Sequence, residues 1–125
     1  MTTLEKARKA HRKAVESLYE GRCTVTEYEP YVKSNKATAY REVTTLEEQP
    51  CRLSYSSAPA TEKGENAATK QQNIKLFLAP EINIRPGSRI MVTQNGVTQD
   101  YCQTGQPAVY ATHQEINLEL WKGWT

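Results

Sequence analysis

Two histidines and three cysteines are the side chains of this sequence best suited to catalysis or metal binding. His11 falls on the apolar stripe of a predicted N-terminal helix, and His113 begins the last predicted strand. We find no carboxylate or cysteine around either histidine at the spacing of a metal site or catalytic triad. Adjacent Glu47 and Glu48 would point to opposite sides of an extended chain, so they do not form an acid and base pair. We therefore expect a protein that is not an enzyme, with no cofactor and no metal.

The cysteines are odd in number and widely spaced, at Cys23, Cys51 and Cys102. This pattern fits neither a disulfide framework nor a metal knuckle. We expect reduced cysteines that serve as apolar residues on strands.

The charges are nearly balanced, with 16 Lys and Arg against 14 Asp and Glu, a net charge of +2. This balance argues against a dedicated nucleic-acid binder, because such binding depends on neutralising phosphates with a basic surface. The sequence has no apolar run long enough to cross a bilayer, and its N-terminus lacks the apolar region of a secretory signal. We expect synthesis in the cytoplasm and no membrane partner.

A helix is predicted over residues 3–20. Thr2 and Glu5 have capping-box spacing, and Gly21 can end the helix in a left-handed conformation. The residues that recur at helical intervals, here called the apolar stripe, are Leu4, Ala7, His11, Ala14 and Leu18. Its alanines bury little area, so we expect weak docking on the body or on a neighbouring subunit. The opposite, mostly basic face offers a candidate protein interface, or an ordinary solvated surface, at Lys6, Lys9, Arg12 and Lys13.

After Gly21 the hydrophobic period changes from 3.6 to 2. Alternating stretches read RCTVTEYE, TAYREVTT, CRLSY, NIKLFL, RIMVTQNGVTQDYC and QEINLELW. Asn95-Gly96 is a strong hairpin signal. Six or seven short strands and one helix predict a single mainly β domain over residues 1–125, with a helical part at 1–21. The rest, 22–125, is expected to form a small antiparallel β-barrel with a long inter-strand loop.

That loop, from Ser56 to Gln72, is 17 residues long and reads as structureless. Such length in a compact domain indicates a functional segment or a linker, with a mobile surface loop of no function as the alternative. Going out and back, it reaches roughly 25 to 30 Å at about 3.3 Å per residue. The charges of the loop, at Glu62, Lys63, Glu65 and Lys70, sum to zero. We therefore expect the loop to bind phosphate weakly.

Two tryptophans close the sequence. Trp is enriched at binding hot spots, and Trp121 has the opposite parity from Ile116 on the last strand. Trp121 and Trp124 are therefore candidate interface residues.

The order of these parts resembles a known family. EEQPCRLSYSS, a polar insertion, and NIKLFLAPEINIRPGSRIMVTQNGVTQDYCQTGQPAVYATHQEINLEL are similar to the small head-closure, or stopper, proteins of long-tailed bacteriophages and related prophages. The similarity covers residues 47–120. The N-terminal helix departs from it, because the simplest members of the family lack this helix or have a shorter one.

The resemblance implies a non-enzymatic virion protein of the neck, assembled in the host cytoplasm. It implies a ring of about twelve copies between the portal and adaptor on the head side and the tail terminator or tail tube on the tail side. Packaged double-stranded DNA would pass through the ring, although the isolated chain could be a monomer. A channel-gating loop is implied at Pro59, Thr61, Glu62, Lys63, Gly64, Glu65 and Lys70.

Two rival functions stay open. One is a tail terminator or adaptor protein of the same connector, without a plug. The other is a small nucleic-acid-binding barrel, in which aromatic residues line a basic groove. The tyrosines look too scattered for that groove: Tyr28, Tyr31, Tyr40, Tyr55, Tyr101 and Tyr110.

Overall fold

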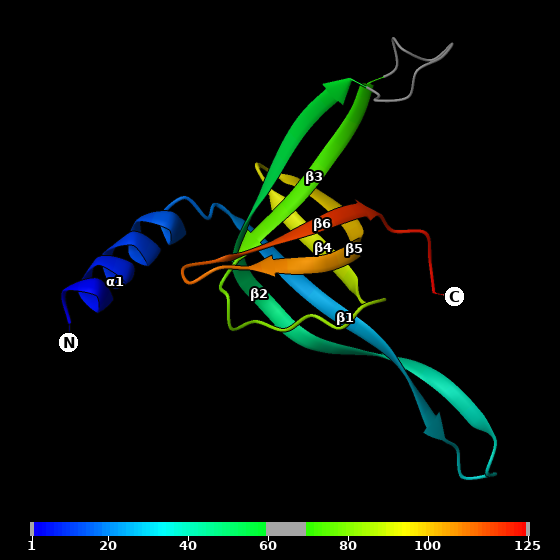
Figure 1. The fold of residues 1–125 in the computed structure, drawn as a ribbon. Helices are drawn as coiled ribbons and strands as arrows, with labels where there is room; N and C mark the ends of the chain where they lie inside the picture. Colours follow the sequence, from blue (N-terminus) through cyan, green and yellow to red (C-terminus); the bar gives the residue numbers. More distant parts are fainter. Residues whose placement is uncertain (1, 60–69, 125) are drawn as a thin grey trace.

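The computed structural model describes residues 2–59 and 70–124, which form one helix and six strands (Figure 1). The elements are α1 (Thr3–Glu16), β1 (Gly21–Val32), β2 (Thr38–Pro59), β3 (Lys70–Leu78), β4 (Arg89–Gln94), β5 (Val97–Val109) and β6 (Gln114–Leu120). All paired strands are antiparallel, and they close into a barrel in the order β1-β2-β3-β6-β5-β4. This confirms the predicted mainly β-barrel fold with an N-terminal helix. None of the described helical segments is long and apolar enough to cross a membrane.

The barrel interior is filled by alternate residues of its strands, as the period of two predicts. Its fully buried side chains include Cys23, Val25, Cys51, Leu76, Leu78, Ile90, Val92 and Ile116. The prediction that the cysteines lie on strands is confirmed, with Cys23 on β1, Cys51 on β2 and Cys102 half-buried on β5, and all three are free. A hydrogen bond with the Cys23 thiol, together with burial, raises the pKa of Cys51 and keeps it a thiol at neutral pH.

The helix ends earlier than predicted. The capping box of Thr2 and Glu5 is present, but Ser17 caps the C-terminus after Glu16. The prediction that Gly21 ends the helix is wrong, because Gly21 is the first residue of β1 and pairs with Cys51. A Cβ on Gly21 would lie 3.1 Å from the Cys51 carbonyl oxygen, so close strand approach is the reason for a glycine here.

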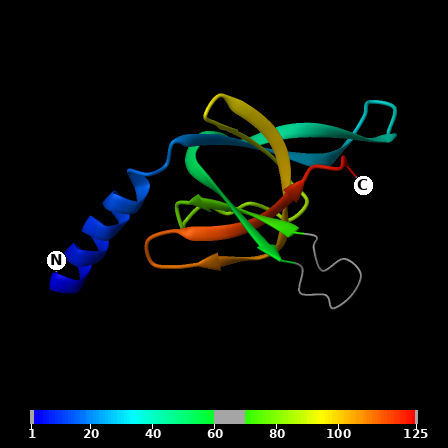
Figure 2. The ribbon, with the colours of Figure 1, turned by 90° about the horizontal axis from the view of Figure 1, so that it is seen from above.

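Helix α1 projects away from the barrel, on one side of the molecule (Figures 1 and 2). None of its 14 residues, all of them described, is buried. The side of the helix nearest the barrel carries Arg12, which bonds to Glu16 on the helix and to Glu81 in the loop between β3 and β4. The apolar stripe faces solvent instead, with Leu4 59% and Leu18 57% exposed. The stripe was expected to dock either on the body of the same chain or on a neighbouring subunit. It does not dock on the body of the same chain.

Two hairpins extend beyond the closed barrel (Figure 1). Strand β1 pairs with β4 from Arg22 to Thr26 but continues its pairing with β2 as far as Val32. We call the part of this hairpin beyond Thr26 the β1–β2 arm. Strand β2 is long because two predicted strands join through Glu48, which has a φ of 49°.

The second hairpin corrects the predicted loop at 56–72. Ser56 to Pro59 pair with Lys70 to Asn73, so both ends of that segment belong to strands, and we call this part the β2–β3 arm. Backbone hydrogen bonds need no apolar side chain, which is why the polar composition hid these strand ends. Elsewhere the predicted hairpin turn is confirmed, since Asn95 and Gly96 both have positive φ, at 54° and 77°.

Candidate functional site

The predicted gating residues fall at the end of the β2–β3 arm. Pro59 ends β2 and pairs with Lys70, the first residue of β3. Thr61, Glu62, Lys63, Gly64 and Glu65 lie outside the described residues. A gating role for these seven residues therefore stays a prediction.

The predicted basic interface lies on α1. Lys6, Lys9 and Lys13 are exposed, whereas Arg12 is half-buried. Arg12 donates hydrogen bonds to Glu81 and Glu16, which raise the pKa of its guanidinium, and the bond from Arg12 lowers the pKa of Glu81. Arg12 is thus committed to an intramolecular contact and is a poorer interface candidate than the three lysines.

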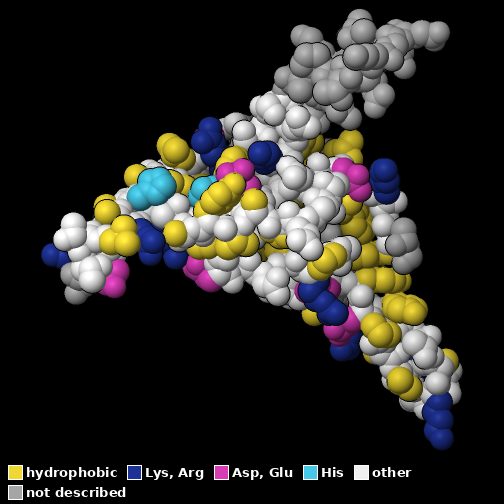
Figure 3. Space-filling model, viewed as in Figure 1, with side chains coloured by type: hydrophobic (Ala, Val, Ile, Leu, Met, Phe, Trp, Pro, Cys, Tyr) yellow, Lys and Arg dark blue, Asp and Glu magenta, His cyan; other side chains and the backbone are white. Residues whose placement is uncertain are grey.

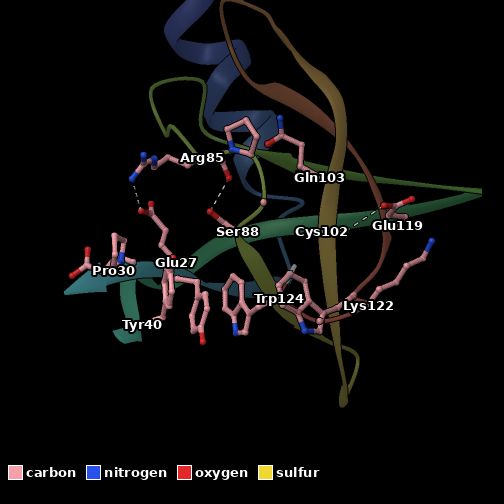
Figure 4. Close-up of a pocket in the computed structure, with 16 residues that line it drawn as sticks. Glu27, Pro30, Tyr40, Arg85, Ser88, Cys102, Gln103, Glu119, Lys122 and Trp124 are labelled. Atoms are coloured by element: carbon pink, nitrogen blue, oxygen red, sulfur yellow. Dashed lines mark hydrogen bonds and ion pairs between the residues drawn. The ribbon is translucent and has the colours of Figure 1, made fainter. Parts of the chain in front are cut away.

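The two predicted tryptophans join an aromatic row at the base of the β1–β2 arm (Figure 4). The ring of Tyr28 stacks on Tyr40 on one side, with centroids 5.3 Å apart, and on Trp124 on the other, at 4.8 Å. Trp121 packs edge-on against Trp124 at 4.6 Å. Four aromatic rings from three distant parts of the sequence therefore form one continuous surface.

Strand pairing explains how the row forms. In the β1–β2 arm Tyr28 is opposite Glu42 and Tyr40 is opposite Pro30, so the two tyrosines are diagonal neighbours. After β6 the backbone N–H of Trp121 donates to the Asp100 carbonyl, 3.1 Å away. This bond directs the last described residues toward the arm.

Trp124 completes the row by donating from Nε1 to Oε1 of Glu42, 2.9 Å away on β2. Sequence reasoning identified both tryptophans but missed Tyr28 and Tyr40, and the view that these two tyrosines are scattered is wrong. The available signal was their alternation within the stretches TEYEPYV and TAYREV, but the register of the two strands was unknown.

The row lines a groove of about 590 Å³, which we call the aromatic groove. Its rim is charged, with Glu27, Glu29, Glu119, Arg85 and Lys122. Glu27 pairs with Arg85 at 3.3 Å, and Glu29 pairs with Arg41 at 3.0 Å. Hydrophobic side chains also gather on this side of the molecule, where the β1–β2 arm leaves the barrel (Figure 3). The arrangement suits a ligand that presents both an apolar surface and charge.

A histidine site lies elsewhere, before β6. Its geometry corrects the statement that His113 has no carboxylate at useful spacing, because Nε2 of His113 lies 3.0 Å from Oε2 of Glu115. Thr112 Oγ1 is 3.3 Å from Nδ1 of the same ring. This order of groups resembles a nucleophile, base and acid, but Thr112 is only 6% exposed and is not accessible to a substrate. The contacts fix the start of β6 instead.

No group of three or more His, Cys, Asp or Glu side chains that could hold a metal ion occurs within residues 2–59 and 70–124. The features that stand out in the described residues are an exposed helix, two arms and an aromatic groove.

These features define a class, the small closed antiparallel barrels with projecting helices and hairpins. No family matches the sequence, and no curated protein does. Among solved structures, the chain is similar to the phage-like element PBSX protein xkdH from Bacillus subtilis. The TM-score is 0.47, with 10% sequence identity, and the match covers 79% of this chain and 91% of that chain.

Proposed function

We propose that this protein is a structural virion protein of a phage neck, a head-closure subunit that joins the DNA-filled head to the tail. The sequence resemblance over residues 47–120 suggests this function. The observation that carries it is the β2–β3 arm, at the place where the resemblance puts a channel-gating segment.

The β2–β3 arm has the form that such a role requires. Strand β3 pairs with β6 only from Ile74 to Leu78, whereas its pairing with β2 continues for four more residue pairs, from Asn73 to Lys70. At about 3.3 Å per residue, these pairs carry the arm about 13 Å beyond the barrel wall. An isolated two-stranded hairpin is only marginally stable in water, so the arm would gain from packing against its equivalents at a ring axis.

The barrel in this proposal is the wall of the ring. Head-to-tail contacts that close by rotation give a cyclic ring, and matching the portal requires about twelve copies. The head-side partner is the portal or adaptor, the tail-side partner is the tail terminator or tail tube, and double-stranded DNA passes through the channel. The gating residues are those predicted between Pro59 and Lys70.

The rivals have less support. A tail terminator or adaptor without a plug has no use for the β2–β3 arm. The aromatic groove offers rings for a nucleic-acid-binding module, but Tyr28 already stacks on neighbours at both faces. The rim is also not basic, because Arg85 and Lys122 stand against Glu27, Glu29 and Glu119, so it offers no net attraction for phosphates.

Electron microscopy of particles from an induced lysogen with this reading frame deleted tests the proposal. Tailless heads without DNA beside free tails of normal length are the expected result. Tails of uncontrolled length would move the protein to the terminator class, and unaltered particles would remove it from the neck.

A second part of the same experiment tests the gating role. A variant in which Asn-Gly replaces residues 57–72 keeps every pair of the barrel itself, and its unfolding midpoint verifies the fold. Complementation with the wild-type gene should restore filled heads, whereas the shortened variant should not retain DNA. Filled, stable heads with the shortened variant would contradict gating.

A further inference from the structure

Two surfaces that lack partners within the described chain lie on opposite sides of the barrel. Helix α1 leaves one side, and the C-terminal segment, whose Trp121 and Trp124 line the aromatic groove, lies on the other (Figures 1 and 2). Both views show this separation. A contact between them within one molecule is therefore excluded by the position of the barrel.

The helix needs a partner on physical grounds. A helix of 14 residues is marginal in water by itself, and helices in proteins gain most of their stability from packing an amphipathic face. Here the apolar stripe is exposed along its whole length, from Leu4 to Leu18. The small residues Ala7 and Ala14 between the leucines would let another surface approach the helix backbone closely.

The aromatic groove is complementary to this helix in polarity and in charge. It offers aromatic rings for the leucines and alanines. Of its three rim carboxylates, Glu27 pairs with Arg85 and Glu29 with Arg41, which leaves Glu119 as the one without an ion pair among the described residues. Helix α1 carries five cations and two carboxylates, a net charge of +3. Glu119 accepts from the Cys102 thiol, forms no ion pair in the described part of the chain, and is available to meet Arg8, which borders the apolar stripe because it lies four residues after Leu4.

We propose that α1 of one copy packs through its apolar stripe into the aromatic groove of the next copy, so that the chains associate head to tail. The inference rests on the proposed ring function for closure and adds the contact that joins neighbouring subunits. A contact between different surfaces of identical chains can continue around a ring, as the neck requires.

The contact should be weak for a single pair of chains. A helix of this length is only about 21 Å long at 1.5 Å per residue. One such helix covers less than the roughly 800 Å² per partner of a standard interface. The isolated chain should therefore be mostly monomeric when dilute and associate at high concentration or on a template.

Cross-linking of the purified full-length chain tests the contact. Two variants are mixed in a Cys102→Ser background, one carrying Ala14→Cys on the apolar stripe and the other Lys122→Cys at the groove rim. A short bismaleimide should give a covalent heterodimer in at least fivefold excess over the matched control, in which Lys9→Cys replaces Ala14→Cys. Lys9 lies on the opposite face of the same helix, while the remaining Cys23 and Cys51 are fully buried.

In concentrated solution, equal yields from Ala14→Cys and Lys9→Cys, or no dimer from either, would overturn the proposed contact. The particle experiment separates this failure from that of the neck function. Tailless heads on deletion together with unselective cross-linking would refute the contact alone. Selective cross-linking with unaltered particles would refute the neck function but leave the contact in place.

Discussion

Gln114 is the buried polar residue that attaches the loop between β3 and β4 to the barrel. Its Nε2 donates to the carbonyl oxygens of Ala79 and Ile82, and its side chain is 2% exposed. Replacing it by leucine would leave both carbonyls without this donor, at about 1–3 kcal/mol for each unsatisfied group. We expect Gln114→Leu to lower the free energy of unfolding by about 2–4 kcal/mol in urea titrations. Gln106→Leu, at an exposed position, is the control, and an equal loss from both would contradict this role.

Glu115 should make stability depend on pH in the acid range. A hydrogen bond from His113 lowers its pKa below the ordinary value of 4.5, and Lys75, 3.4 Å away, acts in the same direction. A folded-state pKa below the unfolded one stabilises the fold above pH 4.5, and this contribution disappears as the pH falls through the lowered value. The stability deficit of Glu115→Gln relative to wild type should therefore be full at pH 7 and shrink toward pH 3. Glu47→Gln controls for loss of one carboxylate; a deficit for Glu115→Gln that does not change with pH would refute the linkage.

Among the elements, α1 should unfold independently of the barrel, because none of its residues is buried. Thr2 accepts from the backbone N–H of Glu5 at 3.1 Å, and losing such a cap costs a helix about 1 kcal/mol. Thr2→Ala should reduce the helical signal in circular dichroism without moving the barrel's thermal midpoint, followed by tryptophan fluorescence. Thr3→Ala, which leaves the cap intact, is the matched control. If the thermal midpoint of the barrel falls in Thr2→Ala together with the helical signal, the helix and the barrel unfold together.

Features of helices and strands that depend on neighbouring residues could be predicted from the sequence. Features that depend on pairing with distant strands could not. Capping at Thr2 and the Asn95-Gly96 turn depend on neighbouring residues, so the sequence identifies them. The end of α1 and the extent of the β2–β3 arm depend on partners far along the chain. Gly21 looked like a helix terminator because a positive φ and a close strand approach both favour glycine.

At the scale of the whole molecule, the aromatic groove also depends on contacts between distant residues, which the sequence does not reveal. Trp121 and Trp124 stood out by residue type alone, but their partners Tyr28 and Tyr40 required the register of β1 on β2 and the path of the chain after β6. The balanced composition argues against a dedicated nucleic-acid binder, but it does not say where on the surface the charges lie. No periodicity could indicate that α1 and the C-terminal segment with its two tryptophans lie on opposite sides of the barrel.

The aromatic row also couples the C-terminal segment to the β1–β2 arm. Among the described residues, the arm beyond Thr26 pairs with no strand outside its own hairpin. Trp124→Ala removes the stack on Tyr28 and the bond to Glu42, whereas Trp124→Phe keeps an aromatic ring. An aromatic pair is worth about 0.5–1.5 kcal/mol, so amide hydrogen exchange in the arm should accelerate roughly three- to tenfold in Trp124→Ala. Barrel-core amides should keep their rates, and Trp124→Phe should lie near wild type. Unchanged arm exchange in Trp124→Ala would mean that the arm is held by its own strand pairing, and the C-terminal segment would then lie on it without stabilising it.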